Sequence, residues 1–164
     1  MFWWELKKRL PNVDIIYANA IWWEIRMVKT PEEIERLTRA SAITELAIKS
    51  ALREIRPGTM EREVINKYHS AVTAEGGRST FCILVSGSRT AQPHALASDK
   101  AIEDGDLIRY DIGCTYGYYH ADNARALVLG TPSGEQNRIW DAMAQGVNAA
   151  VGLMAPGVDV RDVY

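Results

Sequence analysis

Apolar residues recur at helical spacing along three stretches of the chain, and start and stop signals frame each stretch. TPEE at residues 30–33 is a capping box with a proline in the first helical turn, and SGEQ at residues 133–136 is a second capping box. Proline-glycine or glycine-glycine pairs follow at residues 57–58, 76–77 and 156–157 and act as stop signals. The sequence therefore predicts helices over residues 30–55, 59–76 and 133–154.

Two further stretches have the composition of β-strands. Residues 80–86 (TFCILVS) are short and apolar, so they predict a buried strand. Residues 107–129 are rich in β-branched and aromatic residues and predict two strands joined by a tight turn at Tyr116 and Gly117. Helices combined with an antiparallel hairpin indicate an α+β fold.

The predicted turn fixes which residues of the hairpin face each other. With that turn, Asp111 faces Asp122, with Cβ atoms roughly 4.5–5.5 Å apart. Two carboxylates placed in this way repel each other unless a positive charge lies between them or one of them is protonated. A divalent cation with oxygen ligands would neutralise the negative charge of the two carboxylates, and so would Arg109 on the same face or His120 beside Asp122. Spacing alone leaves both solutions open.

The first 28 residues differ from the rest of the chain. Their apolar residues predict a short helix that ends at Pro11 and then a short strand from Val13 to Tyr17. Four of the five tryptophans lie within the first 23 residues, and aromatic side chains this dense need a surface to cover. We therefore expect residues 1–28 to be the remnant of an upstream amino-terminal domain and its linker.

Composition describes one ordinary globular domain, with 47% hydrophobic residues, 24% charged residues and a net charge of −2. A chain without a basic patch is not expected to bind nucleic acid. No apolar run approaches the roughly 18 residues of a membrane span, and no signal-peptide pattern is present. Cys82 and Cys114 form no C-x-x-C pair, so we expect reduced, buried thiols in a cytoplasmic protein rather than a disulfide.

One pattern occurs twice. Pro57-Gly58-x-x-x-Arg62-Glu63-Val64 returns as Pro156-Gly157-x-x-x-Arg161-Asp162-Val163, 99 residues later. A period this long indicates the duplication of a whole α+β unit rather than a solenoid repeat. The second copy reaches only to Tyr164, so the sequence is expected to be truncated.

Five motifs together resemble the creatinase/prolidase/methionine aminopeptidase superfamily (peptidase family M24), and above all its Xaa-Pro dipeptidases and aminopeptidases. In chain order they are KTPEEI at residues 29–34, Pro57-Gly58, Pro93-His94, GDLI-x-YDIG at residues 105–113 and GY-x-x-x-D-x-x-R at residues 117–125. The resemblance implies the pita-bread fold, which has two related α+β halves. Residues 29–164 would then be the amino-terminal half of such a metallopeptidase domain.

The resemblance also implies a site. The two metal-bridging aspartates of the family fall on Asp111 and Asp122, and its substrate-side histidine falls on His94. The family uses a dinuclear Mn, Co, Zn or Fe centre that activates water for the hydrolysis of short, proline-containing peptides. We therefore expect Asp111 and Asp122 as metal ligands and His94 as a catalytic residue.

The sequence departs from the family pattern in two ways. The family completes its site with a His and two Glu from the second half, and no residues here correspond to them. The usual S-D-x-T-R-T reads ADNARA at residues 121–126, and Arg109 replaces an apolar residue. We therefore expect the chain alone to bind metal weakly and to be inactive, with a second half-domain or a second copy in a homodimer as partner. The alternative is a non-catalytic half-domain that self-associates or pairs with another chain.

Overall fold

The computed structural model describes residues 2–163, which form six α-helices, one short 3-10 helix and three β-strands. In chain order the elements are α1 (Phe2–Arg9), α2 (Asn19–Met27), α3 (Pro31–Leu52), α4 (Glu61–Ala74), β1 (Arg78–Ser86), η1 (Gly87–Ala91), β2 (Leu107–Tyr116), β3 (Tyr119–Val128), α5 (Gly134–Leu153) and α6 (Val160–Val163). The chain divides into two compact units, residues 1–35 and residues 36–164.

The first unit contains α1, α2 and the first turn of α3. The predicted helix before Pro11 is confirmed as α1. The predicted strand from Val13 to Tyr17 is wrong, because these residues have no regular secondary structure. Among the described residues no strand pairs with this segment, and a strand without neighbours is not stable in water. The sequence analysis missed α2, although Ile21, Trp22 and Ile25 follow helical spacing.

The start of α3 has the predicted capping box. The backbone N–H of Thr30 donates to the Glu33 carboxylate at 2.7 Å, and the N–H of Glu33 donates to Thr30 Oγ1 at 3.3 Å. The same device opens α5, where the N–H of Gln136 donates to Ser133 Oγ at 3.2 Å. Each box satisfies backbone donors that the first turn of a helix leaves free.

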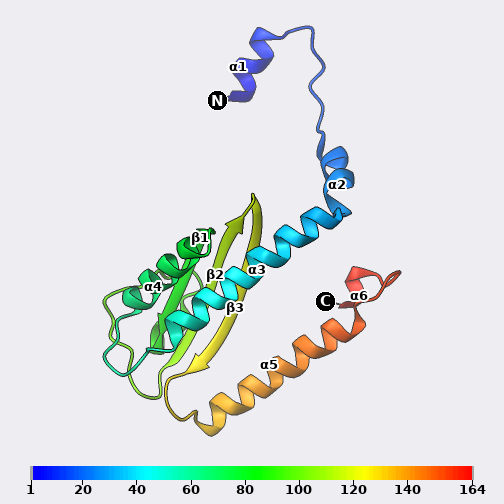
Figure 1. Cartoon of the computed structure of the whole chain (residues 1–164). Coiled ribbons are helices and arrows are strands. Elements are labelled where there is room, and N and C mark those ends of the chain that lie inside the picture. The colour runs from blue at the N-terminus through cyan, green and yellow to red at the C-terminus, as the bar shows by residue number, and fades with distance from the viewer. Residues whose placement is uncertain (1, 164) are drawn as a thin grey trace. The chain divides into compact units, whose positions relative to one another are not determined.

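The second unit is built on an antiparallel sheet with the strand order β1-β2-β3. Figure 1 shows α3 and α4 against one face of this sheet. The helices predicted over residues 30–55, 59–76 and 133–154 correspond to α3, α4 and α5, and the strand predicted at residues 80–86 corresponds to β1. The predicted α+β fold is confirmed.

The core lies between the two helices and the sheet. Along β2, alternate residues are buried against the helices because successive side chains of a strand point to opposite faces. The core consists of Ala40, Ile43, Ala47, Ile48, Ala51, Val64, Ile65, Tyr68, Val72, Leu84, Ile102, Ile108, Tyr110, Ile112 and Cys114. The other side chains of β2 therefore lie on the face opposite α3 and α4.

The turn of the β2–β3 hairpin is not the predicted one. It is formed by Gly117 and Tyr118, and the pair that closes it is Tyr116 and Tyr119. Both turn residues have positive φ, 54° for Gly117 and 71° for Tyr118. Such a turn matches the right-handed twist of the flanking strands, although a non-glycine residue is strained in this conformation. The register is therefore displaced by two positions from the predicted one.

Two further findings concern the sequence-based expectations about membrane spans and about the two cysteines. Within residues 2–163, no helix combines the length and apolarity that crossing a membrane requires. Cys82 and Cys114 are free thiols, and Cys114 is buried. Burial raises the pKa of the Cys82 thiol to about 11, which leaves it protonated and unreactive at neutral pH.

Glycine substitutions distinguish the observed turn at Gly117 and Tyr118 from the predicted turn at Tyr116 and Gly117. Replacing Tyr118 with Gly should remove the strain of a side chain at positive φ and stabilise the chain by about 1 kcal/mol, or about 2–4 °C in Tm. Replacing Tyr116 with Gly should lower Tm, because Tyr116 is an extended strand residue whose ring contacts Arg39. Thermal unfolding followed by circular dichroism measures both, and the opposite order of Tm values would contradict the observed turn.

Candidate functional site

The site predicted from sequence lies on the face of the β2–β3 hairpin opposite α3 and α4. Asp111 does not face Asp122 as predicted: Asp111 pairs with Ala124, and Asp122 pairs with Gly113. Because the register differs by an even number of positions, both carboxylates still point to the same face. They are diagonal neighbours, and diagonal side chains on one face are close enough to interact.

The two carboxylates interact in the structure. The pKa of Asp111 is raised, first because the half-buried carboxyl group loses hydration and then because of the charge of Asp122 and a hydrogen bond with it. Arg109 and His94 oppose this effect with positive charge. The pair is therefore a site where negative charge is concentrated and only partly neutralised by the neighbouring side chains.

Gly113, the residue paired with Asp122, lies where neighbouring atoms leave no room for a side chain. A Cβ atom at this position would collide with the backbone oxygen of Ala121 and would lie 2.9 Å from side-chain atoms of Thr80 and Phe81. Its backbone has no positive φ, so the constraint at this glycine is steric. The glycine therefore permits the tight approach of β1, β2 and β3 on the face that carries the carboxylates.

His94 reaches this region from the loop that follows η1. The guanidinium of Arg109 donates to the backbone oxygens of Gln92 at 2.8 Å and Pro93 at 3.0 Å, which attaches the loop to β2. The His94 side chain is exposed, and it is the smallest of the influences on the pKa of Asp111, which it acts to lower. The structure thus brings together His94, Arg109, Asp111 and Asp122, as the sequence predicted. His120, which was also a candidate, is exposed and pairs with Thr115 nearer the turn.

Sequence analysis missed one buried carboxylate near the site. Glu61, the first residue of α4, is fully buried and accepts hydrogen bonds from Ser86 and Ser98. The only sequence signal was its position in the first turn of a helix, where an exposed acidic residue is the usual interpretation. Its binding partners are 25 and 37 positions away, so no local pattern identifies them.

The carboxylates form only part of a metal site. Within residues 2–163, no group of three or more His, Cys, Asp or Glu side chains is arranged to hold a metal ion. Carboxylate oxygens are suitable ligands for hard divalent cations, but two of them do not complete a coordination sphere. The chain thus supplies two carboxylates, Asp111 and Asp122, of the kind that bind a divalent cation, on one face of the hairpin.

Comparison with known proteins assigns the chain to a family. Residues 35–164 match the profile of metallopeptidase family M24. The chain belongs to metallopeptidase family M24. The Xaa-Pro dipeptidase of Pyrococcus furiosus is 36% identical over 142 residues, which are 85% of this M24 chain and 41% of the relative. The Xaa-Pro dipeptidase of Pyrococcus horikoshii is 32% identical over 161 residues, which are 97% of this chain and 46% of the relative.

Solved structures agree with this assignment. The prolidase from Pyrococcus horikoshii superposes with a TM-score of 0.93 at 33% identity, covering 99% of this M24 chain and 47% of the prolidase. The X-Pro aminopeptidase from Thermotoga maritima superposes with a TM-score of 0.84 at 32% identity, covering 91% of this chain and 42% of that protein. The predicted family and the predicted partial pita-bread fold are confirmed, and the chain spans less than half the length of these relatives.

The raised pKa of Asp111 predicts how stability depends on pH. A carboxyl group whose pKa is raised on folding contributes stability that is fully present below its ordinary pKa of 3.8 and is lost as pH rises through the raised value. Asp111→Asn should therefore raise Tm at pH 7 by about 1–3 °C, because like charges on one sheet face cost roughly 0.2–1 kcal/mol. The advantage should disappear near pH 3.5.

Thermal unfolding in EDTA at the two pH values measures this effect. Asp141→Asn is the matched control, because Asp141 is an exposed carboxylate on α5. A Tm for Asp111→Asn that lies below the parent at pH 7 would show that favourable contacts of the Asp111 carboxylate outweigh its repulsion by Asp122.

Proposed function

We propose that this chain carries the amino-terminal half of a metal-dependent peptidase site that acts on short, Xaa-Pro peptides. The observation that supports it is the pair Asp111 and Asp122, brought together on one face of the hairpin of an M24 chain. Relatives that share about a third of its residues are named Xaa-Pro dipeptidases. In this proposal residues 29–164 form the half-domain and residues 1–28 belong to an amino-terminal domain and its linker.

Asp111 and Asp122 would be the metal ligands of this half. Loss of hydration and then the charge of Asp122 raise the pKa of Asp111, and a bound cation would relieve the repulsion between the two carboxylates. Mn, Co, Zn or Fe would suit the carboxylate donors together with the ligands still needed. A bound metal pair supplies an activated water for attack on the peptide bond and positive charge for the developing oxyanion.

The chain's own residues would orient the substrate and hold the ligands in place. His94 is exposed beside the carboxylates, so its ring nitrogens are available to hydrogen-bond a substrate carbonyl or carboxylate. Arg109 fixes the loop that carries His94 and balances part of the charge of Asp111. Gly113, paired with Asp122, allows β1 and β3 to approach β2 closely at this point, because a Cβ atom there would collide with the Ala121 oxygen.

The proposed site needs further ligands. In the family pattern these are a His and two Glu from the second half of the domain, and this sequence has no matching residues. We therefore propose that the chain is inactive by itself and that another half-domain completes the site. The two free cysteines agree with a reducing compartment such as the cytoplasm as its place of action.

Metal binding and turnover test separate parts of the proposal. Titration calorimetry should detect weak Mn²⁺ binding, with a Kd on the order of 10⁻³ M, because two carboxylates provide few ligands. Asp111→Asn and Asp122→Asn should each abolish it, whereas Asp141→Asn should not. With an Xaa-Pro dipeptide and Mn²⁺, the chain alone should show no turnover that EDTA removes.

Complementation provides the positive arm of this experiment. Adding the separately purified carboxyl-terminal half of the Pyrococcus furiosus Xaa-Pro dipeptidase should produce turnover that Asp111→Asn removes. EDTA-sensitive turnover by the chain alone would contradict the need for a second half. Mn²⁺ binding that survives both aspartate substitutions would place the metal elsewhere.

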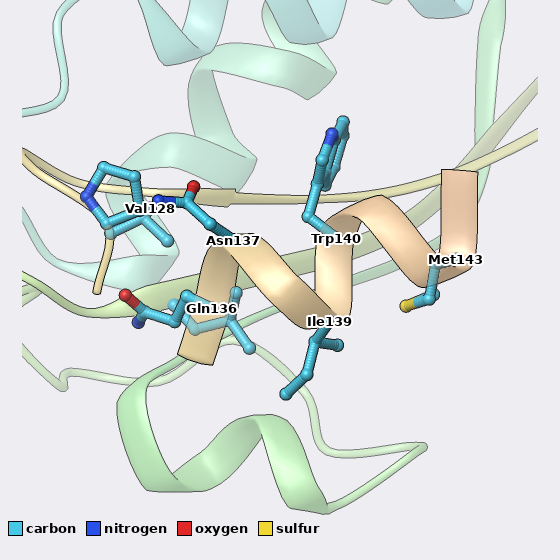
Figure 2. A pocket seen from close by; sticks show the side chains of 8 residues that line it. Val128, Gln136, Asn137, Ile139, Trp140 and Met143 are labelled. Carbon is cyan, nitrogen blue, oxygen red and sulfur yellow. The ribbon is translucent and has the colours of Figure 1, made fainter. Parts of the chain in front are cut away.

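The structure also favours a second candidate function, a half-domain that self-associates through α5. None of the described residues of α5 is buried. Ile139, Met143, Val147 and Val151 recur at helical spacing along one face and are 50–64% exposed. At the start of the helix, Trp140 and Met143 line a groove of about 270 Å³ with Leu107 and Val128 (Figure 2). An exposed apolar face of this kind is typical of an interaction surface.

Size-exclusion chromatography with light scattering tests this candidate. The chain should elute as a dimer with twice the mass of one 18.3 kDa chain. Val147→Glu should shift it to the monomer because a charge would be buried in the interface, whereas Gln145→Glu on the opposite side of α5 should not. A wild-type chain that remains monomeric at high concentration would contradict self-association.

A further inference from the structure

The Glu61 side chain connects both ends of one loop. The N–H and hydroxyl of Ser86 donate to Glu61 Oε1 at 2.7 and 3.0 Å. The N–H and hydroxyl of Ser98 donate to Glu61 Oε2 at 3.0 and 2.8 Å. Ser86 ends β1 and Ser98 follows the loop, so residues 87–97, which include His94, leave from and return to one buried carboxylate.

A second set of contacts closes the loop on itself. The guanidinium of Arg89 lies 3.3 Å from Glu61 Oε2 and also donates to the backbone oxygen of Leu96 at 2.7 Å. Arg89 therefore connects the first part of the loop both to the carboxylate and to the residue two positions after His94. The contact with Glu61 is an ion pair without a hydrogen bond, whereas the contact with Leu96 is a hydrogen bond from a charged donor, which is stronger than a neutral one.

The capping of α4 does not require this carboxylate. The backbone N–H of Met60 donates to the Glu63 carboxylate at 3.0 Å, which is the side-chain capping contact of the helix. A buried carboxylate is costly unless its oxygens are satisfied, and here all four hydrogen-bond donors come from the two ends of the His94 loop. The hydrogen bonds of the Glu61 side chain are therefore not needed to cap α4, and they connect the helix to the loop instead.

We propose that Glu61 is a positioning residue that holds the His94 loop against the hairpin, with Arg109 as the contact on the opposite side. Arg109 binds the backbone oxygens of Gln92 and Pro93, directly before His94. The carboxylate fixes the ends of the loop and the guanidinium fixes its middle. The consequence for substrate binding rests on the proposed function, whereas the positioning of the loop does not.

Glu61→Gln tests the charge with little change in shape. The amide oxygen can accept from one serine, but the amide nitrogen then faces the N–H donor of the other, and Arg89 loses its counter-charge. Backbone bonds from Glu61 to Lys100 and from Arg62 to Ser98 remain, so the start of α4 should stay attached to residues 98–100. The effect is therefore expected within residues 87–97.

Amide ¹⁵N relaxation on the 164-residue chain measures the effect. Order parameters of residues 87–97 should be about 0.85 in the wild type and should fall below about 0.6 in Glu61→Gln, while those of β2 remain unchanged. Thr44→Val is the matched control, because Thr44 is also buried and hydrogen-bonded but contacts Ala40 and Cys114 instead of the loop. Loop order parameters that stay unchanged in Glu61→Gln would overturn the proposal.

Ser98→Ala keeps the inference testable if Glu61→Gln does not fold. It removes the hydroxyl contact to Glu61 Oε2 at 2.8 Å and should loosen the end of the loop near Ser98 more than the end near Ser86. Equal loosening at both ends, or none at either end, would contradict the role of the carboxylate as the connection between them.

Mn²⁺ distinguishes failure of this inference from failure of the proposed function. If Asp111 and Asp122 bind Mn²⁺, paramagnetic broadening should affect their amides and those of the His94 loop in the wild type. In Glu61→Gln the hairpin amides should still broaden, and the broadening of the loop should be lost or become uneven. Broadening absent from the wild-type hairpin would count against the metal site only, because the order parameters alone decide the positioning role.

Discussion

The two-residue alternation of β2 is the constraint on which the rest of this structure depends. Ile108, Tyr110, Ile112 and Cys114 point into the core beneath α3 and α4, so Asp111 must point to the opposite face. Because the core lies between the sheet and the helices α3 and α4, two carboxylates can lie close together on the opposite face without entering the core. A displacement of β2 by a single residue would turn Asp111 toward α3, where an unpaired carboxylate is far too costly. The burial of alternate β2 residues therefore determines both the packing of the sheet and the face on which Asp111 lies.

This constraint also explains what the sequence could predict. The apolar run at residues 80–86 and the β-branched and aromatic composition of residues 107–129 identified the strands. The predicted face of Asp111 and Asp122 was right even though their pairing was wrong, because a displacement of two positions preserves the face. The turn was misplaced since local propensity disfavours positive φ at Tyr118, and the twist of the whole hairpin overrides that preference. Glu61 could not be recognised, because its partners Ser86 and Ser98 become neighbours only after β1 and the following loop have folded. The segment from Val13 to Tyr17 has strand composition without a strand to pair with, which sequence alone does not reveal.

Arg109 gives a physical meaning to a departure from the family pattern. An apolar residue at this position could only pack, whereas the guanidinium donates to two backbone oxygens of the His94 loop and offsets charge on Asp111. The same side chain thus attaches the loop and moderates the repulsion between the carboxylates. Arg109 therefore gives this face of the hairpin two contacts to the loop and a positive charge that an apolar residue could not supply.

The way in which the His94 loop is attached follows from the exposure of its residues. Leu96 is 70% exposed and His94 is also exposed, so apolar burial contributes little to the position of the loop around His94, although Ala97 at its end packs against the core. Apolar contacts are non-directional, and an exposed loop that relied on them would have many arrangements of similar energy. Hydrogen bonds to charged groups are directional, and here they come from Glu61 on α4 and Arg109 on β2, both of which belong to rigid elements of the scaffold. An exposed histidine can thus be held near the carboxylates by contacts of the loop backbone, which leaves its ring accessible to solvent.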